Sequence, residues 1–378
     1  PRAGAGATDP GKPVPVYRAE VVGSLLRPPA LQQSAAEYAA GRISASALVA
    51  AQEAAILAAL RTQADCGLDV CTDGEMRRRH FADPLLAGLN AFGTGQGQAD
   101  PWRDNSGAAQ QTSDMAVITE KLISTGNAEA AYFDFANAHA RLPVKVTIPS
   151  PTYLLSRWKP EFSAGAYPDP SEMFQDSATI LAGVVADLVA AGCRYIQFDA
   201  PDLTAVVDPS TRKDLTAKGV DPDDLIATAC SLINQITEPV DPAVKFAVHL
   251  CRGNLRGMWR KQGGYEALSE TFFNGLTRLD TFMLEFDDER SGSFECLAAL
   301  PPGKVAVLGL VTTKRGELEP ENGLVARIEA ATAHVSVDQL AISTQCGFAS
   351  TAEGNPVSED DQRRKLELVA RVAQRVWP

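Results

Sequence analysis

Short apolar stretches alternate along the chain with longer segments in which apolar residues recur at helical spacing. The short stretches are apolar or β-branched, as expected of buried strands. Eight such strands are predicted, at 18–22, 68–72, 144–148, 194–199, 244–249, 281–286, 304–309 and 340–344. Amphipathic helices are predicted between them, for example at 46–67 and 177–193. The chain is therefore predicted to be an α/β protein.

Strands that alternate with helices indicate a parallel sheet with crossover connections. Eight strand–helix units favour a closed (β/α)₈ barrel of the TIM type, with an open doubly wound sheet as the alternative. No G-x-G-x-x-G motif follows the first strand, which weighs against a dinucleotide-binding sheet. We expect one barrel domain over residues 16–378.

The connections between the predicted strands differ in length. About 70 residues separate the second strand from the third, and 93–114 within them is rich in Gly, Gln, Asp and Ser. We expect an insertion at about 90–140 that lies over the barrel mouth. Long polar loops also follow the fourth and fifth strands, where barrel enzymes carry catalytic groups. Residues 1–15 are rich in Pro, Gly and Ala, and are expected to form a tail that is disordered or artificially added.

Composition narrows the classes of function. The 378 residues carry 35 Lys and Arg against 47 Asp and Glu, a net charge of −12 without a basic block, which argues against nucleic-acid binding. No uninterrupted apolar stretch reaches the ~20 residues of a membrane span, so no membrane association is expected. The seven cysteines are odd in number and widely scattered, which favours a reducing, cytoplasmic compartment.

Polar side chains stand where the predicted strands end, at the face where barrel enzymes keep their active sites. They are Ser24, Glu75, Ser150, Asp199, His249 with Cys251, Glu285 and Cys346. Loop starts are often polar, so the residue types matter more than the polarity itself.

His249 and Cys251 point to the same side of an extended chain and can share one ion. Cys346 and Glu285 end other predicted strands and can approach the same point over the barrel mouth. Two thiolates, an imidazole and a carboxylate suit a tetrahedral zinc site. An H-x-C pair alone fits a buried histidine and a core cysteine equally well.

Eight segments in order resemble the catalytic barrel of cobalamin-independent methionine synthase and its single-domain relatives. They are VVGSLLRP, TDGEMRR, TIPSPTYLL, YIQFDAPDL, HLCRGN, LEFDDERSG, VLGLVTTK and STQCGF. The resemblance covers about residues 16–375 and implies a (β/α)₈ barrel with a catalytic zinc. It places the zinc ligands at His249, Cys251, Glu285 and Cys346. It also implies a homocysteine site in which Ser24 holds the carboxylate and Glu75 and Asp199 hold the ammonium. The alternative for these two carboxyls is a salt bridge to an arginine of the run Arg77–Arg79, which fits Glu75 better than Asp199.

The chemistry implied is transfer of a methyl group to a thiol. Zinc lowers the pKa of a bound thiol, and three anionic ligands favour alkylation of sulfur over hydrolysis. The family's donor is a methylated reduced folate, whose amine needs a proton to leave. Longer relatives have a histidine where this chain has Lys314 and its neighbours, so Lys314 is the candidate for the acid. Trp158 is a candidate stacking surface for the donor, or ordinary packing.

Other functions stay open at this point. The chain has no room for the second barrel of the long synthases, so its methyl donor is unassigned. Epoxyalkane:coenzyme M transferases share the zinc motif, and Arg27 with Arg77–Arg79 are candidate partners for a sulfonate. A non-catalytic barrel with structural zinc would draw its ligands from short loops. A metal-free decarboxylase of the porphyrin-processing type would leave His249, Cys251 and Cys346 without a role.

Overall fold

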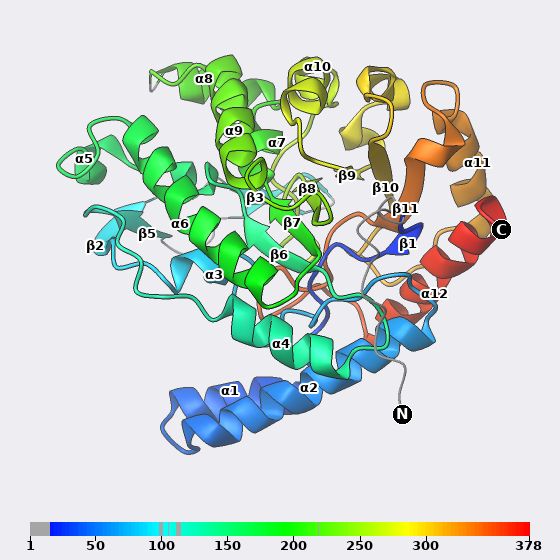
Figure 1. Ribbon diagram of the computed structural model, residues 1–378, viewed down its shortest axis with the longest axis horizontal. Helices are drawn as coiled ribbons and strands as arrows, with labels where there is room; N and C mark the ends of the chain where they lie inside the picture. The colour runs from blue at the N-terminus through cyan, green and yellow to red at the C-terminus, as the bar shows by residue number, and fades with distance from the viewer. Residues whose placement is uncertain (1–15, 98–100, 105, 111–114, 218) are drawn as a thin grey trace.

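Seven strands form one parallel sheet in a computed structural model that describes residues 16–97, 101–104, 106–110, 115–217 and 219–378 (Figure 1). The order across the sheet is β1-β11-β10-β9-β8-β7-β6. The strands are β1 (Ala19–Glu20), β6 (Val146–Pro149), β7 (Tyr195–Asp199), β8 (Lys245–Leu250), β9 (Thr281–Glu285), β10 (Val305–Val311) and β11 (Leu340–Thr344). Seven of the eight predicted strands are thus confirmed, with bounds shifted by a few residues. The predicted tail at 1–15 lies outside the described residues.

The eighth predicted strand, 68–72, joins the two edges of this sheet without forming a full strand. Cys71 forms a parallel bridge with Val144, and the Lys145 amide donates to the Cys71 carbonyl at 2.8 Å. On the other side, the Asp69 amide donates to the Ala19 carbonyl at 2.9 Å. Backbone hydrogen bonds therefore link β6 to β1 through this segment, and the fold is the TIM-barrel-like ring that the sequence predicts.

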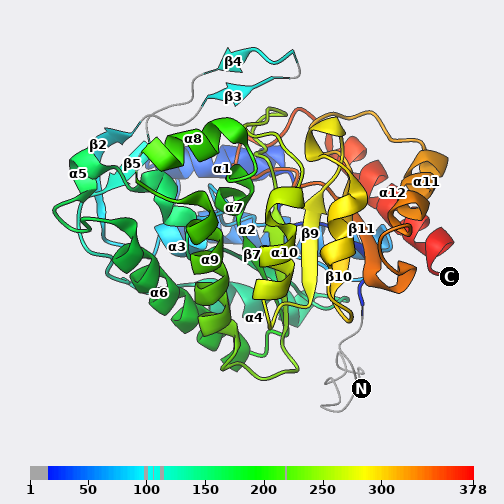
Figure 2. The same ribbon diagram turned by 90° about the horizontal axis from the view of Figure 1, so that it is seen from above.

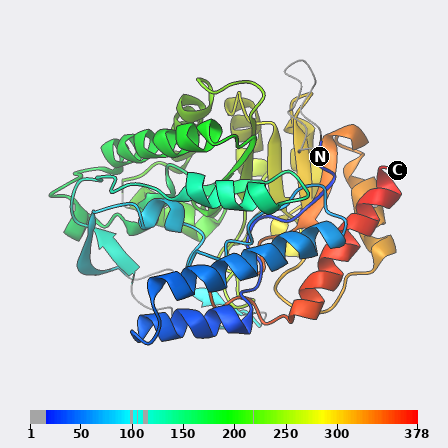
Figure 3. The same ribbon diagram turned by 60° about the horizontal axis from the view of Figure 1, so that its bottom comes forward.

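Helices surround the ring of strands. They are α1 (Pro29–Ala39), α2 (Ala45–Asp65), α3 (Asp83–Leu86), α4 (Glu129–His139), α5 (Pro160–Ser163), α6 (Pro170–Ala190), α7 (Pro201–Ala205), α8 (Pro209–Ala217), α9 (Pro222–Thr237), α10 (Glu266–Gly275), α11 (Glu321–Ala331) and α12 (Glu359–Val376). Short 3₁₀ turns lie at η1 (Tyr153–Arg157), η2 (Glu289–Ser291), η3 (Phe294–Ala299) and η4 (Val337–Gln339). Figure 3 shows α1 and α2 packed side by side on one flank of the molecule.

Helix ends follow local sequence signals. The side chains of Ser44 and Asp221 accept hydrogen bonds from the first turns of α2 and α9, and Pro222 opens α9. Ser358 and Asp361 form a reciprocal capping box at the start of α12. These caps satisfy amide groups that lack partners within the helix, and they fix where each helix begins.

Among the described residues, α6 is the only helix that has the length and apolar composition of a membrane span. Core helices of globular proteins share these features. Its inward face buries Met173, Phe174, Leu181 and Val185, and the helix packs against α9 and α4. This packing accounts for the apolar composition of α6.

The predicted insertion contains two antiparallel hairpins and a helix. β2 (Phe92–Gly97) pairs with β5 (Met115–Ile118), and β3 (Trp102–Arg103) pairs with β4 (Ala109–Gln110). Figure 2 shows β3 and β4 standing out from the body of the molecule. Helix α4 follows and packs against α2 and α6, so the last part of the insertion belongs to the outer layer of the barrel.

Alternation along the strands separates two cores. In β10, Ala306 and Leu308 join the large cluster beneath the helices, whereas Val305 and Val307 join a small cluster on the opposite face. Because successive strand residues point to opposite faces, the small cluster lies inside the ring. Its other members are Val22, Met283 and Ala341.

A buried ion pair shares this interior. The Lys145 ammonium lies 2.6 Å from the Glu20 carboxylate and donates to the Val21 carbonyl at 2.8 Å. The Tyr195 hydroxyl lies 3.2 Å from the same carboxylate. Both charged side chains are fully buried, so each depends on the other for compensation.

Replacement of Lys145 by Met should lower the free energy of unfolding by about 3–5 kcal/mol, because it leaves Glu20 buried without a cation. The double variant Glu20→Leu/Lys145→Met should lose less than the single variant, since no charge is then stranded. Urea unfolding of the wild type, both single variants and the double variant measures the coupling. If the loss of unfolding free energy in the double variant equals the sum of the losses in the two single variants, Glu20 and Lys145 do not stabilise each other.

Candidate metal centre and active-site cavity

One cavity of about 650 Å³ opens at the carboxyl ends of the strands. Six of the residues predicted from the sequence line it: Ser24, Glu75, Asp199, His249, Cys251 and Cys346. Glu285, Lys314 and Trp158 were also predicted for the site, and they are not among the described residues that line the cavity.

Three potential metal ligands meet in this cavity. His249 lies in β8, Cys251 directly follows β8, and Cys346 lies two residues after β11. Their ligand atoms all lie within 4.8 Å of one another, and all three side chains are buried. The i, i+2 spacing in extended chain directs His249 and Cys251 to the same side, as predicted.

The imidazole of His249 is oriented by its neighbour strand. Its Nδ1 atom lies 3.3 Å from the Met283 carbonyl oxygen, whereas its buried Nε2 atom has no hydrogen-bond partner among the described residues. A hydrogen bond from the Cys251 thiol is the main reason that the pKa of Cys346 lies well below its usual value. One nitrogen without a partner beside one sulfur that deprotonates readily is a donor set suited to zinc.

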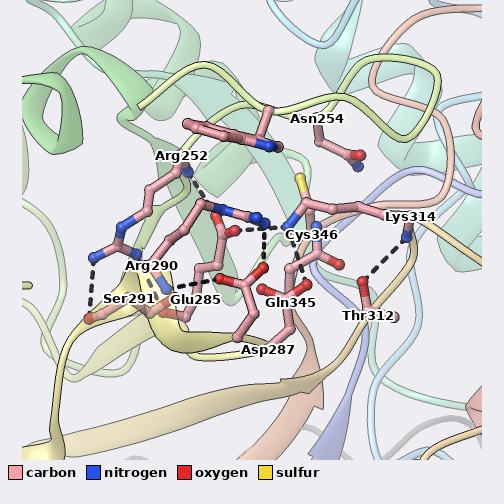
Figure 4. A network of polar contacts seen from close by, with 12 residues as sticks. Arg252, Asn254, Glu285, Asp287, Arg290, Ser291, Thr312, Lys314, Gln345 and Cys346 are labelled. Atoms are coloured by element: carbon pink, nitrogen blue, oxygen red, sulfur yellow. Dashed lines mark hydrogen bonds and ion pairs between the residues drawn. The ribbon is translucent and has the colours of Figure 1, made fainter. Parts of the chain in front are cut away.

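Glu285 is held beside this group by two hydrogen bonds. Its Oε1 atom accepts from the Lys314 ammonium at 2.8 Å, and its Oε2 atom accepts from the Arg252 amide at 2.6 Å (Figure 4). The structure does not include Glu285 in the group within 4.8 Å. Glu285 as a zinc ligand therefore stays a prediction.

Lys314 is enclosed by carboxylates rather than exposed to the cavity. Its ammonium also bonds Asp287 at 3.0 Å, and its side chain is 3% exposed. Burial lowers the pKa of Lys314, but Glu285 and Asp287 outweigh that effect and raise it above its usual value. These positions do not support the predicted role of Lys314 as the acid that protonates a substrate; they make it a partner of Glu285.

Two carboxyl groups predicted to hold an ammonium line the cavity. The Oε1 atom of Glu75 accepts from the Thr147 hydroxyl at 2.9 Å, but its buried Oε2 atom has no partner among the described residues. Asp199 accepts from the Gln197 amide at 2.7 Å. Burial raises the pKa of Glu75 to about 7, against the lowering effect of Arg78, which lies 3.5 Å from its Oε1 atom, and Asp199 raises it further. Both carboxyl groups line the cavity.

The backbone of Glu75 is held in a left-handed conformation, with φ of 57°. The Asp73 side chain accepts from the Glu75 amide, and the Arg27 guanidinium donates to the Glu75 carbonyl at 2.7 Å. The same guanidinium donates to the carbonyls of Leu25, Arg78 and Ala349. Arg27 thus holds the main chain at Glu75 in place.

Ser24 lies against the segment that follows Cys346. Its hydroxyl accepts from the Ala349 amide at 3.2 Å, and its carbonyl accepts from the Phe348 amide at 2.8 Å. A Cβ atom at Gly347 would lie 2.0 Å from the Ser24 hydroxyl. Glycine at this position therefore permits the close approach of Ser24 to the segment that begins at Cys346.

The arginines considered as sulfonate partners are engaged by other protein groups. Arg78 donates to the Thr147 hydroxyl at 2.7 Å and to Glu129 at 2.8 Å, and it also pairs with Glu75 at 3.5 Å. Arg77 lies over the rings of Tyr132 and Phe135. None of Arg27 and Arg77–Arg79 is among the described residues that line the cavity.

Sequence reasoning missed much of the outer cavity wall. The missed residues include Trp102, Tyr153, Arg157, Arg256, Arg260 and Lys261. Three belong to the polar loop after β8 that was predicted to carry function, but no motif marked them individually. Trp158, the predicted stacking surface, is instead packed in the hydrophobic core, where its indole donates to the Tyr167 carbonyl at 3.0 Å.

Comparisons with known proteins agree with this arrangement. The family profile described as "Cobalamin-independent synthase, Catalytic domain" matches residues 18–360. The uncharacterized protein YxjH of Bacillus subtilis is 36% identical over 367 residues, which cover 96% of this chain and 95% of that protein.

Solved structures share the fold. A putative vitamin-B12-independent methionine synthase from Listeria monocytogenes has a TM-score of 0.73 and 29% identity, over 97% of this chain and all of that one. A B12-independent methionine synthase from Shewanella, solved in complex with selenomethionine, has a TM-score of 0.73 and 18% identity, over 96% and 98% of the two chains.

The purified protein should contain about one zinc ion per chain, because the donor set matches a catalytic zinc site. Replacement of Cys346 by Ser should remove most of the zinc, as measured by elemental analysis after dialysis. Cys66→Ser is the matched control, since Cys66 lies at the end of α2 outside the ligand group. Full zinc content in the Cys346 variant would refute the assignment.

Replacement of Lys314 by Met should lower the free energy of unfolding by about 3–5 kcal/mol, because Glu285 and Asp287 are then buried without their cation. Lys121→Met is the control: Lys121 pairs with Glu172 at the surface and should contribute no more than about 1 kcal/mol. If urea unfolding shows equal losses of unfolding free energy in the Lys314 and Lys121 variants, the buried ion pair stabilises the protein no more than the surface pair does.

Proposed function

Since the chain belongs to the family of cobalamin-independent synthase catalytic domains, we propose that it is a zinc-dependent methyltransferase that methylates a thiol, with homocysteine as the acceptor. One observation carries the proposal: His249, Cys251 and Cys346 line the same cavity as Glu75, whose buried Oε2 atom has no partner among the described residues. A metal-binding group and an ammonium-binding group in one cavity suit a substrate that carries a thiol and an amine.

Zinc is the cofactor we propose, held by His249, Cys251 and Cys346. When bound, zinc lowers the pKa of a coordinated thiol and leaves the sulfur nucleophilic at neutral pH. Glu285 is the proposed fourth ligand, because each of its carboxylate oxygens keeps a lone pair beside the hydrogen bond that it accepts. All seven cysteines are free thiols, which supports the cytoplasm as the compartment.

The acceptor's amino-acid end would be held by residues of three strand ends. Glu75 and Asp199 offer negative charge to an ammonium, and a cation between them would offset the cost of burying two carboxylates. Ser24 lies beside Gly347, and its hydroxyl would donate to the acceptor's carboxylate. The Shewanella protein of the same fold was solved with selenomethionine, the selenium analogue of methylated homocysteine, which supports an amino-acid acceptor.

The proposed reaction moves a methyl group from a tertiary amine, as in a methylated reduced folate, to the thiol sulfur. A sulfur–carbon bond forms, the nitrogen–carbon bond breaks, and the amine nitrogen takes up a proton. Lys314 is not a suitable source of that proton, because its ammonium is bonded to two carboxylates away from the cavity lining.

Alkylation of coenzyme M is the second candidate. It needs cations near the end of a short thiol, whereas Glu75 and Asp199 in the cavity are carboxyls. Arg27 is bonded to backbone carbonyls, and Arg78 is bonded to Thr147 and paired with Glu129 and Glu75. A purely structural zinc is disfavoured because structural sites are closed, and these three ligands line a cavity. Both observations favour a catalytic site for an amino-acid thiol.

The zinc-loaded protein should bind L-homocysteine more tightly than 4-mercaptobutyrate, which lacks the amino group, and more tightly than coenzyme M. Replacement of Glu75 by Gln should weaken homocysteine binding by about 10–100-fold, as expected for a buried charged hydrogen bond. Binding of 4-mercaptobutyrate should change little. Isothermal calorimetry measures all three thiols with both proteins.

Glu53→Gln is the control variant, because Glu53 forms a partly exposed pair with Arg77 outside the cavity. A wild-type preference for coenzyme M would contradict the proposed acceptor. If the Glu75 variant prefers homocysteine over 4-mercaptobutyrate as strongly as the wild type does, Glu75 does not bind the ammonium.

A further inference from the structure

Glu285, the proposed fourth zinc ligand, is held in place at its main chain and at one carboxylate oxygen. Its amide donates to the Tyr265 hydroxyl at 2.9 Å, and its carbonyl accepts from the Arg252 guanidinium at 3.2 Å. Its Oε2 atom accepts from the amide of Arg252, the residue directly after the metal ligand Cys251. These bonds place the carboxylate beside the metal-ligand segment without help from Lys314.

The ammonium of Lys314 lies between two carboxylates. It is 2.8 Å from the Oε1 atom of Glu285 and 3.0 Å from the Oδ2 atom of Asp287 (Figure 4). The three side chains are at most 3% exposed. Water screens buried charges little, so each of these charges acts strongly on its neighbours.

The segment that carries Lys314 is tied to the segment that carries the metal ligand Cys346. The Thr313 amide donates to the Gln345 side chain at 2.6 Å, and the Thr313 hydroxyl lies 3.0 Å from the Gly347 carbonyl oxygen. Gln345 and Gly347 directly flank Cys346. The cation therefore keeps its place relative to the metal ligands.

The proposed metal centre has an excess of negative charge. The thiolates of Cys251 and Cys346 together with Glu285 would exceed the charge of one Zn²⁺, and a substrate thiolate would add to that excess. A hydrogen bond from the Lys314 ammonium draws charge from the Glu285 carboxylate and makes it a weaker zinc ligand. Asp287 opposes this effect, because the two carboxylates share one ammonium.

We infer that Lys314 is a positioning residue that acts on zinc through Glu285. Its cation weakens the bond between Glu285 and zinc, so that zinc keeps enough positive charge to accept the substrate thiolate. Asp287 sets how strongly the ammonium engages Glu285. In the metal-free protein the same cation offsets the charge of the two buried carboxylates. The inference rests on the proposed function, in which zinc binds the acceptor thiol.

Two substitutions change the charge on Glu285 in opposite directions. Lys314→Met removes the cation, whereas Asp287→Asn leaves the cation to Glu285 alone. The first should tighten Zn²⁺ binding by about tenfold and the second should weaken it by about tenfold, the lower end of the range for groups that contact a metal ligand. Competition with a chelator of known zinc affinity measures both variants against the wild type.

Homocysteine binding should shift the other way in the same proteins. Calorimetry on the zinc-loaded proteins should find weaker binding in Lys314→Met, because Glu285 then gives its full charge to zinc, and tighter binding in Asp287→Asn. A loss of structure would weaken the binding of both zinc and thiol. Shifts of zinc and thiol affinity in the same direction would therefore overturn the inference, and so would an unchanged zinc affinity in either variant.

Lys145→Met is the matched control, because it also strands a buried carboxylate, that of Glu20. Lys145 directly precedes β6, at the end of the strand away from the cavity. Its zinc affinity should stay within about twofold of the wild type, as expected for an independent site. Tightening as large as in Lys314→Met would contradict an action through Glu285. If Lys314→Met does not fold, Asp287→Asn decides alone, since Lys314 and Glu285 stay paired in it.

Failure of the proposed function has a different signature. A wild type that binds no zinc refutes the proposed cofactor, and with it the role of Lys314. A wild type that binds zinc but not homocysteine refutes only the acceptor, and opposite shifts of zinc affinity in the two variants would still support the role of Lys314.

Discussion

Parallel pairing in register brings the chemistry of this protein together. Asp199 and His249 are direct partners on β7 and β8, and Glu285 pairs with Gly309 on β9 and β10. All strands of the ring run the same way, so every strand end delivers its last side chains to one face. Cys251 and Cys346 thereby meet in space although they lie far apart in the sequence. A one-residue slip of β8 would turn His249 and Cys251 away together, because both occupy the same side of the strand.

Most buried charges around the cavity are compensated within the protein. Lys314 neutralises Glu285 and Asp287, Arg78 pairs with Glu129 and with Oε1 of Glu75, and Arg27 is held by backbone carbonyls. The exceptions are informative because buried polar atoms without partners are rare in folded proteins. Among the described residues, His249 Nε2 and Glu75 Oε2 are two such atoms, and their residues line the same cavity. A bound metal would supply the missing partner of His249 Nε2, and a bound amine would supply that of Glu75 Oε2.

The strands and the polar residues at their ends could be predicted from the sequence, because local patterns of apolar and polar residues determine them. Buried strands such as 244–249 and 281–286 are recognisable because they are continuous apolar runs, and their polar final residues stand out by contrast. Long-range pairing was not predictable in the same way. Lys314 shows a cation at a strand end, but nothing local indicates that its ammonium lies between Glu285 and Asp287. Trp158 and Trp102 both lie in loop regions, and only tertiary packing decides that the first enters the core and the second the cavity.

The β3–β4 hairpin is attached to the loop that follows β8, and this attachment has an evolutionary consequence. Its position is fixed by main-chain bonds, which any residue except proline can make at Arg103 and Trp259. The side chains that the hairpin presents are therefore free to diverge without loss of its anchorage. The strand ends carry the opposite constraint, because there each side chain is itself the functional group. Related proteins with this fold can therefore change the side chains of the hairpin, and with them the ligand contacted there. The buried residues at the strand ends can stay the same.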